Sequence, residues 1–238
     1  MENRMKNEVF AAGLCIGLGL VILGLCLKGG IENFKAKDRV VSVKGLSEKE
    51  VPADRVIWPL TFKEIGDDLA ALNTGILAKN KAIVSYLTIN GIKESEIVVS
   101  APEIIDMQAE RYSANASRYR YNITSIVTVN STEVNKVRAL MSRQNELIKQ
   151  GIAITGDDFR FQKQFLYTKL NSIKPGMIEE ATKNARASAL KFAQDSQSKL
   201  GKIKTADQGQ FSISDRDANT PHIKTVRVVT TINYYLED

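Results

Sequence analysis

The residues best suited to chemistry lie in one short polar loop near the C-terminal end of the sequence. Asp215, Asp217 and His222 bring two carboxylates close to the single histidine of the chain. Paired carboxylates can act as general acid and base or bind a hard cation. The same residue types are also typical of a plain turn, because Asp, Asn and Ser side chains bond their own backbone there. The loop is therefore a candidate hydrolytic site, with a simple turn as the more common alternative.

Most other catalytic devices are missing from the sequence. Both cysteines, Cys15 and Cys26, fall in an apolar N-terminal segment, so the rest of the chain has no thiol nucleophile, disulfide or cysteine zinc ligand. The sequence contains no GxSxG, HExxH, Walker A or GxGxxG motif. These absences favour a protein that is not an enzyme and that needs no cofactor and no metal.

A second local pattern interleaves arginine with tyrosine, and it comprises Arg111, Tyr112, Arg118, Tyr119, Arg120 and Tyr121. Such residues can neutralise and stack on nucleic acid, but a strand with tyrosines inside and arginines outside looks the same. The net charge of +6 is spread along the chain and not clustered as a nucleic-acid footprint should be. We therefore expect no nucleic acid, and treat Arg111, Tyr112, Arg118 and Arg120 as a candidate surface for a neighbouring subunit or an acidic lipid headgroup.

The elements that position these residues are organised around a long helix predicted over residues 174–203. Pro175 suits its first turn, and Gly201 supplies its left-handed end. Its most regular feature is a stripe of small residues at every fourth position, Ala181, Ala185, Ala189 and Ala193. Small side chains let a helix backbone approach closely, so we expect this helix to lie flat on a sheet with Leu190 and Phe192 flanking the contact.

The preceding half of the chain alternates strand and helix patterns. Residues 51–167 predict the order strand, helix, strand, strand, helix, strand, which is that of a split βαβ unit. The first of these strands places Trp58 in the core and carries Pro59, which requires an edge or a bulge. The helix that follows this strand should begin at Asp67 or Asp68 and end at Asn90-Gly91.

The remaining boundaries are set by turn formers. A strand from residue 40 should end at Gly45, single strands should cover 97–107, 119–129 and 152–167, and one helix should run from a cap at Thr132 to Gly151. Two further strands, near 205–213 and 223–236, close the chain. The predicted fold is α+β, an antiparallel or mixed sheet with helices packed on one face.

The N-terminal segment predicts a membrane anchor. Residues 9–27 form an uncharged run of 19, which is the length that a helix needs to cross the hydrocarbon of a bilayer. A cleaved signal peptide is the alternative, but the run exceeds a usual apolar region and shows no A-x-A site. Gly13 and Gly17 form a GxxxG pair that is suited to packing two such helices, although glycine is common in membrane helices. We divide the chain into an anchor at 1–30, a linker at 31–38 and a domain at 39–238.

The orientation of this anchor has signals in both directions. Lysines and arginines after the apolar run outnumber those before it, which by charge count would leave the C-terminal domain in the cytoplasm. An N-terminal anchor preceded by eight residues is, in contrast, the usual form of an uncleaved export signal. We expect export, with the C-terminal domain on the far side of the membrane from the cytoplasm.

Several stretches resemble the SIMPL-domain family, which includes periplasmic YggE-type proteins. They are VSVKGLSEKEVPADRVIWPLTF at 41–62, LNSIKPGMIEEATKNARASALKFAQDSQSKLGKI at 170–203 and KTVRVVTTINYYL at 224–236. The resemblance covers about residues 39–238 and implies an exported bacterial α+β domain, in the periplasm or tied to the inner membrane. It also implies a tendency to form oligomers and, in some relatives, a connection to oxidative-stress defence. With the anchor retained, we therefore expect a single-pass protein of the bacterial inner membrane with its domain in the periplasm. It implies no catalytic residue. The expected function is that of a membrane-anchored, self-associating envelope protein, with an anionic-ligand receptor and a hydrolase as alternatives.

Overall fold

The computed structural model describes residues 13–14, 17–28, 39–109, 118–156 and 159–237. The chain divides into two compact units, each assembled from segments that are distant in sequence. The first unit combines Met1–Glu48, Lys174–Ser212 and Arg227–Asp238, and the second combines Lys49–Ile173 and Ile213–Val226. Each unit has its own sheet.

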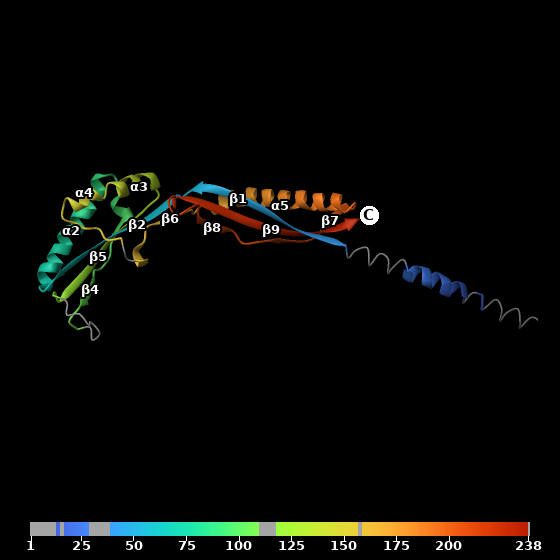
Figure 1. Cartoon of the computed structure of the whole chain (residues 1–238), viewed down its shortest axis with the longest axis horizontal. Coiled ribbons are helices and arrows are strands. Elements are labelled where there is room, and N and C mark those ends of the chain that lie inside the picture. Colours follow the sequence, from blue (N-terminus) through green and yellow to red (C-terminus); the bar gives the residue numbers. More distant parts are fainter. Residues whose placement is uncertain (1–12, 15–16, 29–38, 110–117, 157–158, 238) are drawn as a thin grey trace, which may run out of the picture. The chain divides into compact units, whose positions relative to one another are not determined.

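The second unit is built on a five-stranded sheet in the order β3-β5-β2-β6, in which β4 also pairs with β5. The pairs are antiparallel, and helices α2, α3 and α4 belong to the same unit (Figure 1). The strands are β2 (Arg55–Gly66), β3 (Ile97–Val99), β4 (Glu103–Asp106), β5 (Tyr121–Ser131) and β6 (Gln164–Leu166). The helices are α2 (Leu69–Ile89), α3 (Val134–Ser142) and α4 (Asn145–Ile148). This succession confirms the predicted split βαβ order.

Three boundaries in this unit differ from the prediction. The strand expected at 97–107 is two short strands, because Pro102 lies between them and cannot donate a ladder hydrogen bond. The helix expected to run to Gly151 is broken into α3 and α4. The strand expected at 152–167 is reduced to β6, with one isolated bridge between Thr61 and Thr155 before it. The predicted cap is also misplaced, because the N-cap residue of α3 is Glu133 and not Thr132, and its side chain makes no capping hydrogen bond.

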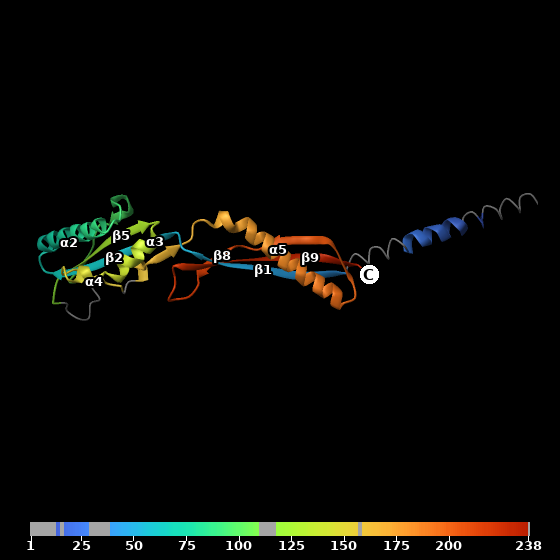
Figure 2. The ribbon, with the colours of Figure 1, turned by 90° about the horizontal axis from the view of Figure 1, so that it is seen from above.

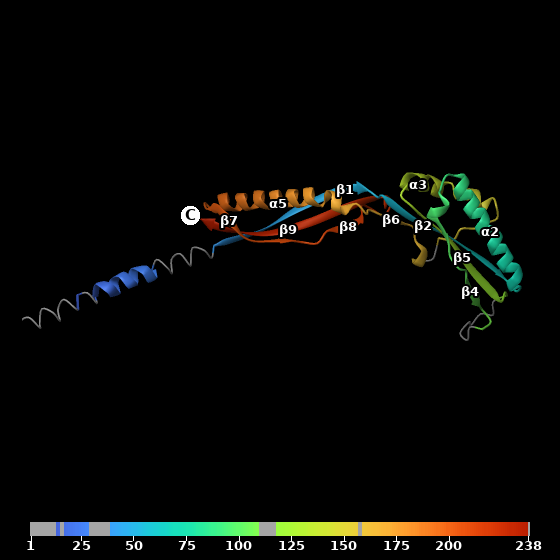
Figure 3. The same ribbon diagram turned by 180° about the vertical axis from the view of Figure 1, so that it is seen from behind.

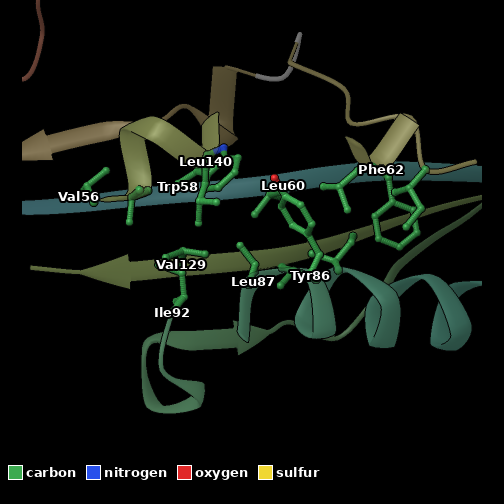
Figure 4. Packing of buried hydrophobic residues seen from close by; sticks show 14 of the residues in the cluster. Val56, Trp58, Leu60, Phe62, Tyr86, Leu87, Ile92, Val129 and Leu140 are labelled. Carbon is green, nitrogen blue, oxygen red and sulfur yellow. The ribbon is translucent and has the colours of Figure 1, made fainter. Parts of the chain in front are cut away.

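The core of this unit confirms the alternation predicted for β2. Val56, Trp58, Leu60 and Phe62 share one buried face of the strand (Figure 4). They pack with residues of α2, β5 and α3, among them Ile76, Ile83, Leu87, Val127, Val129 and Leu140. Burying such large apolar side chains is the main favourable term in folding. The ladder between β2 and β6 covers Arg55–Ile57, so Pro59 lies beyond it, as an edge position requires.

Helix α2 also begins and ends where the sequence predicts. The Asp68 carboxylate accepts hydrogen bonds from the backbone N–H groups of Ala70 at 2.9 Å and Ala71 at 3.1 Å. Gly91, directly after the C-cap residue Asn90, has φ of 86°. An N-cap carboxylate and a left-handed glycine are therefore the physical reasons for both boundaries.

The other sheet has four strands in the order β1-β9-β7, with β8 also pairing with β9, and most of β1, β7 and β9 belongs to the first unit. Helix α5 lies along one side of these strands in Figures 1 and 3, and it crosses over them in Figure 2. The elements are β1 (Val40–Pro52), α5 (Leu170–Asp195), β7 (Lys199–Gln208), β8 (Ser212–Asp215) and β9 (Ile223–Glu237). The α+β class with antiparallel sheets is confirmed, and the expected helix-on-sheet packing is present.

The bounds predicted for the long helix are wrong at both ends. Helix α5 begins at Leu170, so Pro175 lies within it, and it ends at Asp195. Gln197, with φ of 56°, takes the left-handed position after the helix, while Gly201 lies in β7. Leu190 and Phe192 are 42% and 60% exposed and so do not flank the contact with the sheet.

The alanine stripe itself is confirmed. Ala181, Ala185, Ala189 and Ala193 are all buried against the sheet, together with Met177. Gly45 does not end β1 as predicted but lies in the middle of it, where a Cβ atom would stand 1.9 Å from the Ala181 carbonyl oxygen. Ser47 donates a hydrogen bond to the Glu180 carboxylate at 2.8 Å and thereby fixes the same contact.

Part of the predicted anchor lies outside the described residues. Residues 17–28 are helical, and a Cβ atom at Gly13 or Gly17 would have no neighbour within 4 Å. Within the described part of the chain, no helix is both long enough and apolar enough to cross a membrane.

The contact between Gly45 and α5 makes a stability prediction. Gly45→Ala should lower the free energy of unfolding by about 1–3 kcal/mol or more, because the new methyl group overlaps backbone atoms of α5. Gly176→Ala is the matched control, since it lies in α5 with open space around its Cβ position, and it should raise stability by about 0.5–1 kcal/mol. Chemical denaturation measures both, and equal effects of the two substitutions would contradict the close packing.

Candidate interaction surface and the C-terminal loop

The arginine-tyrosine segment leads into β5 in the second unit. Arg111 and Tyr112 lie outside the described residues. Arg120 donates hydrogen bonds from Nε and Nη2 to the Asp106 carboxylate at 3.1 and 2.9 Å, and its guanidinium lies 5.0 Å from the centre of the Tyr121 ring. These bonds hold the pKa of the Asp106 carboxyl below its usual value. The Arg120 charge is thus already used within the chain.

Arg118 and Arg120 are both exposed, but Arg118 differs in that the contact the structure shows for its guanidinium is with a ring and not with a carboxylate. Its guanidinium lies 5.7 Å from the centre of the Tyr119 ring, a cation–π contact. Arg118 and Arg120 are close in sequence, but Arg120 is already paired with Asp106 and its charge is not available to a partner. The predicted surface therefore has fewer unpaired charges than its sequence suggests.

A more distinctive surface is the outer edge of the same sheet, formed by β3 and β4 and named here the β3–β4 edge. It consists of residues Ile97–Val99 and Glu103–Asp106, both of which pair with β5 on their inner side, and no other described strand pairs with them. Val98, Val99 and Ile104 are 57%, 47% and 50% exposed. Large apolar side chains on an open strand edge are a template for pairing with another chain.

Backbone groups at this edge also point outward. The Ser100 N–H bonds the Ile126 carbonyl at 3.0 Å and the Met107 N–H bonds the Arg120 carbonyl at 2.8 Å, both toward β5. Because alternate residues of an antiparallel strand face opposite sides, the N–H and C=O groups of Val99 and Ile104 face away from β5. A second strand could pair with them.

The two carboxylates of this edge are both paired within the chain. Glu103 lies 3.5 Å from an Arg160 nitrogen, and Asp106 is held by Arg120. The edge strand β7 of the other unit has Lys199, Lys202 and Lys204 along it. Lysines on an edge strand are a common protection against pairing with another chain. Sequence reasoning missed the β3–β4 edge, although the runs Ile97-Val98-Val99 and Ile104-Ile105 around Pro102 were its signal.

The C-terminal loop brings its charged residues into internal pairs. Asp215 accepts a hydrogen bond from Lys224, which is 8% exposed. Asp217 accepts from the backbone N–H groups of Asn219 and Thr220, each at 2.8 Å, and from the Arg216 Nε at 3.1 Å. The Thr220 hydroxyl and the Arg216 guanidinium lower the pKa of Asp217 to about 2. His222 faces the Phe165 ring edge-on, with 6.2 Å between ring centres.

These bonds define what the loop can do chemically. Asp217 accepts hydrogen bonds within the turn itself, whereas Asp215, the last residue of β8, pairs with Lys224 of β9. Within the described residues, no three His, Cys, Asp or Glu side chains are grouped closely enough to hold a metal ion. The geometry is that of the Asx-type turn described above as the common alternative.

Comparison with known families gives one match. The sequence profile of the SIMPL family, described as "Protein of unknown function (DUF541)", matches residues 41–232. The matched range includes most of both units and both the β3–β4 edge and the C-terminal loop. Comparison with curated proteins gives no match.

The bonds around Asp217 predict how stability changes with acid. Because the folded-state pKa lies below the unfolded value, Asp217 stabilises the fold above about pH 4 and loses this contribution as pH falls toward 2. Asp217→Asn should therefore lower the melting temperature at pH 7, and the deficit should shrink between pH 4 and 2. Asp207→Asn, at an exposed residue of β7, is the control and should show no such trend. A deficit for Asp217→Asn that stays constant down to pH 2 would contradict this assignment.

Proposed function

The chain belongs to the SIMPL family, and we propose that it is a membrane-tethered envelope protein that works by self-association and not by catalysis. The observation that carries the proposal is the β3–β4 edge, which exposes Val98, Val99 and Ile104, pairs with no other described strand on its outer side, and has both of its carboxylates in ion pairs. The family description assigns no activity, so the proposal is argued from this surface.

The tether is the apolar run at residues 9–27. At a rise of about 1.5 Å per residue, 19 residues in a helix extend over about 28 Å, close to the thickness of the hydrocarbon core. The segment keeps the protein at the bacterial inner membrane, with the residues after it exported to the periplasm. Gly13 and Gly17 allow two tethers to pack closely once the domains associate.

Self-association proceeds by addition of one β3–β4 edge to that of a second copy. The outward N–H and C=O groups of Val99 and Ile104 form hydrogen bonds between the copies, and the side chains of these residues are removed from water at the same time. Burial of apolar area supplies the free energy, at about 25 cal/mol per Å². Arg118 lies in the segment that leads into β5 and adds a charged contact at the rim.

The alternatives have less support. A hydrolase would need free carboxylates in the C-terminal loop, where Asp215 and Asp217 already accept hydrogen bonds from neighbours. An anionic ligand at Arg118 and Arg120 would compete with Asp106 for Arg120. A contribution to oxidative-stress defence would be indirect, because residues 29–238 contain no cysteine.

The β3–β4 edge predicts which substitutions separate the copies. Val99→Lys combined with Ile104→Lys should weaken association of the full-length chain in mild detergent by about tenfold or more, because like charges would face each other across the strand pair. Light scattering coupled to size-exclusion chromatography measures the change. Leu77→Lys is the matched control, because Leu77 is an exposed apolar residue on α2 and its substitution should leave the mass unchanged. A wild-type protein that stays a monomer at every concentration would contradict the proposal.

A further inference from the structure

A pocket of about 450 Å³ in the second unit lies beside α3 and includes the histidine of the C-terminal loop. We name it the α3 pocket. It is lined by one face of α3, by residues next to β6 and by residues 219–222 of the loop. Its volume is in the range of small-molecule sites, which are commonly about 300–1,000 Å³.

The charges of the α3 pocket have one sign. Among the described residues, its lining includes Arg138 and Lys163, together with amide and hydroxyl groups such as that of Ser142, and no carboxylate. Cations of this kind, set among neutral polar groups, favour an anion in the space between them.

The two cations are also uncommitted within the described part of the chain, where neither side chain has a hydrogen bond or an ion pair. Their neighbours differ in this respect, because Lys136 of α3 pairs with Glu133 and Arg143 pairs with Glu146 at 3.0 Å. The described residues thus include acidic partners for Lys136 and Arg143, on either side of Arg138, but none for Arg138 itself. A ligand from outside would complete the arrangement.

Part of the lining of the α3 pocket is apolar. Phe165 is 6% exposed, and Met141 and Pro221 line the same space. The His222 ring contacts Phe165 edge-on. Its carbon atoms therefore extend the apolar part of the lining, and its nitrogen atoms belong to the polar part. Such a pocket suits a ligand with an apolar body and one charged group.

The state of His222 agrees with a positive potential in this space. Burial, and then the charges of Arg138 and Arg216, lower the pKa of His222, whereas Asp217 opposes them. The other charged groups that line the pockets next to His222 are Glu133, Lys136 and Lys163. An anion bound beside the imidazole would favour its protonated form, so binding should tighten as pH falls.

We propose that the α3 pocket binds a small organic anion, a carboxylate or a phosphate monoester, whose charged group meets Arg138 and Lys163 and whose apolar body lies on Phe165 and Met141. The assignment does not depend on self-association, because the pocket uses no residue of the β3–β4 edge. It differs also from the arginine-tyrosine surface predicted from the sequence.

Titration calorimetry of the full-length protein in detergent tests this with phenyl phosphate and benzoate as probes, and with inorganic phosphate and benzyl alcohol as comparators. The two organic anions should bind more tightly than either comparator, and the tighter of the two identifies the preferred head group. Arg138→Gln and Lys163→Gln should each weaken binding by about tenfold or more, since each removes a charge-assisted hydrogen bond. Arg186→Gln, at an exposed arginine of α5, should leave binding unchanged.

A pH series with benzoate adds a second readout. Carboxyl groups have a pKa of about 4, so benzoate stays ionised between pH 5.5 and 7.5. Affinity should rise toward pH 5.5 in the wild type and stay level in His222→Asn. The proposal is overturned if neither organic anion binds, if inorganic phosphate binds as tightly as phenyl phosphate, or if Arg138→Gln and Lys163→Gln bind as the wild type does. Thermal melts of each variant separate a binding defect from a folding defect.

Discussion

The close contact between helix α5 and strand β1 is the constraint on which the first unit depends. Four buried alanines on the helix and Gly45 on the strand bring the two backbones so near that no Cβ atom fits between them. Ala185 and Ala189 form one buried cluster with Val43 of β1 and with Ile232 and Tyr234 of β9. The contact is stabilised by dispersion between these closely packed atoms and by the hydrogen bonds of Glu180 and Asn184 to β1. This geometry tolerates little change in side-chain size.

The second unit relies on a different principle. Its core is a conventional cluster of large side chains between one sheet and its helices, with Leu60, Phe62 and Leu87 almost fully excluded from water. Because α2 and α3 bury the inner strands, the outermost strands have exposed apolar residues. The β3–β4 edge is therefore a consequence of the strand order and is a natural place for a second chain to pair.

The sequence was informative where a local pattern had a direct physical cause. The alternation around Trp58, the cap at Asp68, the left-handed Gly91 and the alanine stripe each depend on neighbouring residues alone. Boundaries set by tertiary contacts were missed. Gly45 is typical of a strand end, but in the structure it allows the close approach of α5 to β1. Pro175 is typical of a helix start, but it lies in the first turns of a longer helix.

The candidate sites show the same division. Asp215, Asp217 and His222 were found from their types, but only the structure shows that Asp217 accepts bonds within the turn and that Asp215 pairs with Lys224 of β9. The β3–β4 edge and the α3 pocket could not be read from the sequence, because strand order decides which strand is outermost and because Arg138, Lys163 and His222 are separated by many residues along the chain. Such groupings have no local periodicity.

Amide hydrogen exchange of the full-length protein, followed as a function of protein concentration, tests self-association most directly. The amides of Val99 and Ile104 face away from β5, so a free copy leaves them open to water. The account predicts that their exchange slows as concentration rises, while the amides of α2 exchange at a constant rate. Fast exchange at Val99 and Ile104 at every concentration would contradict it.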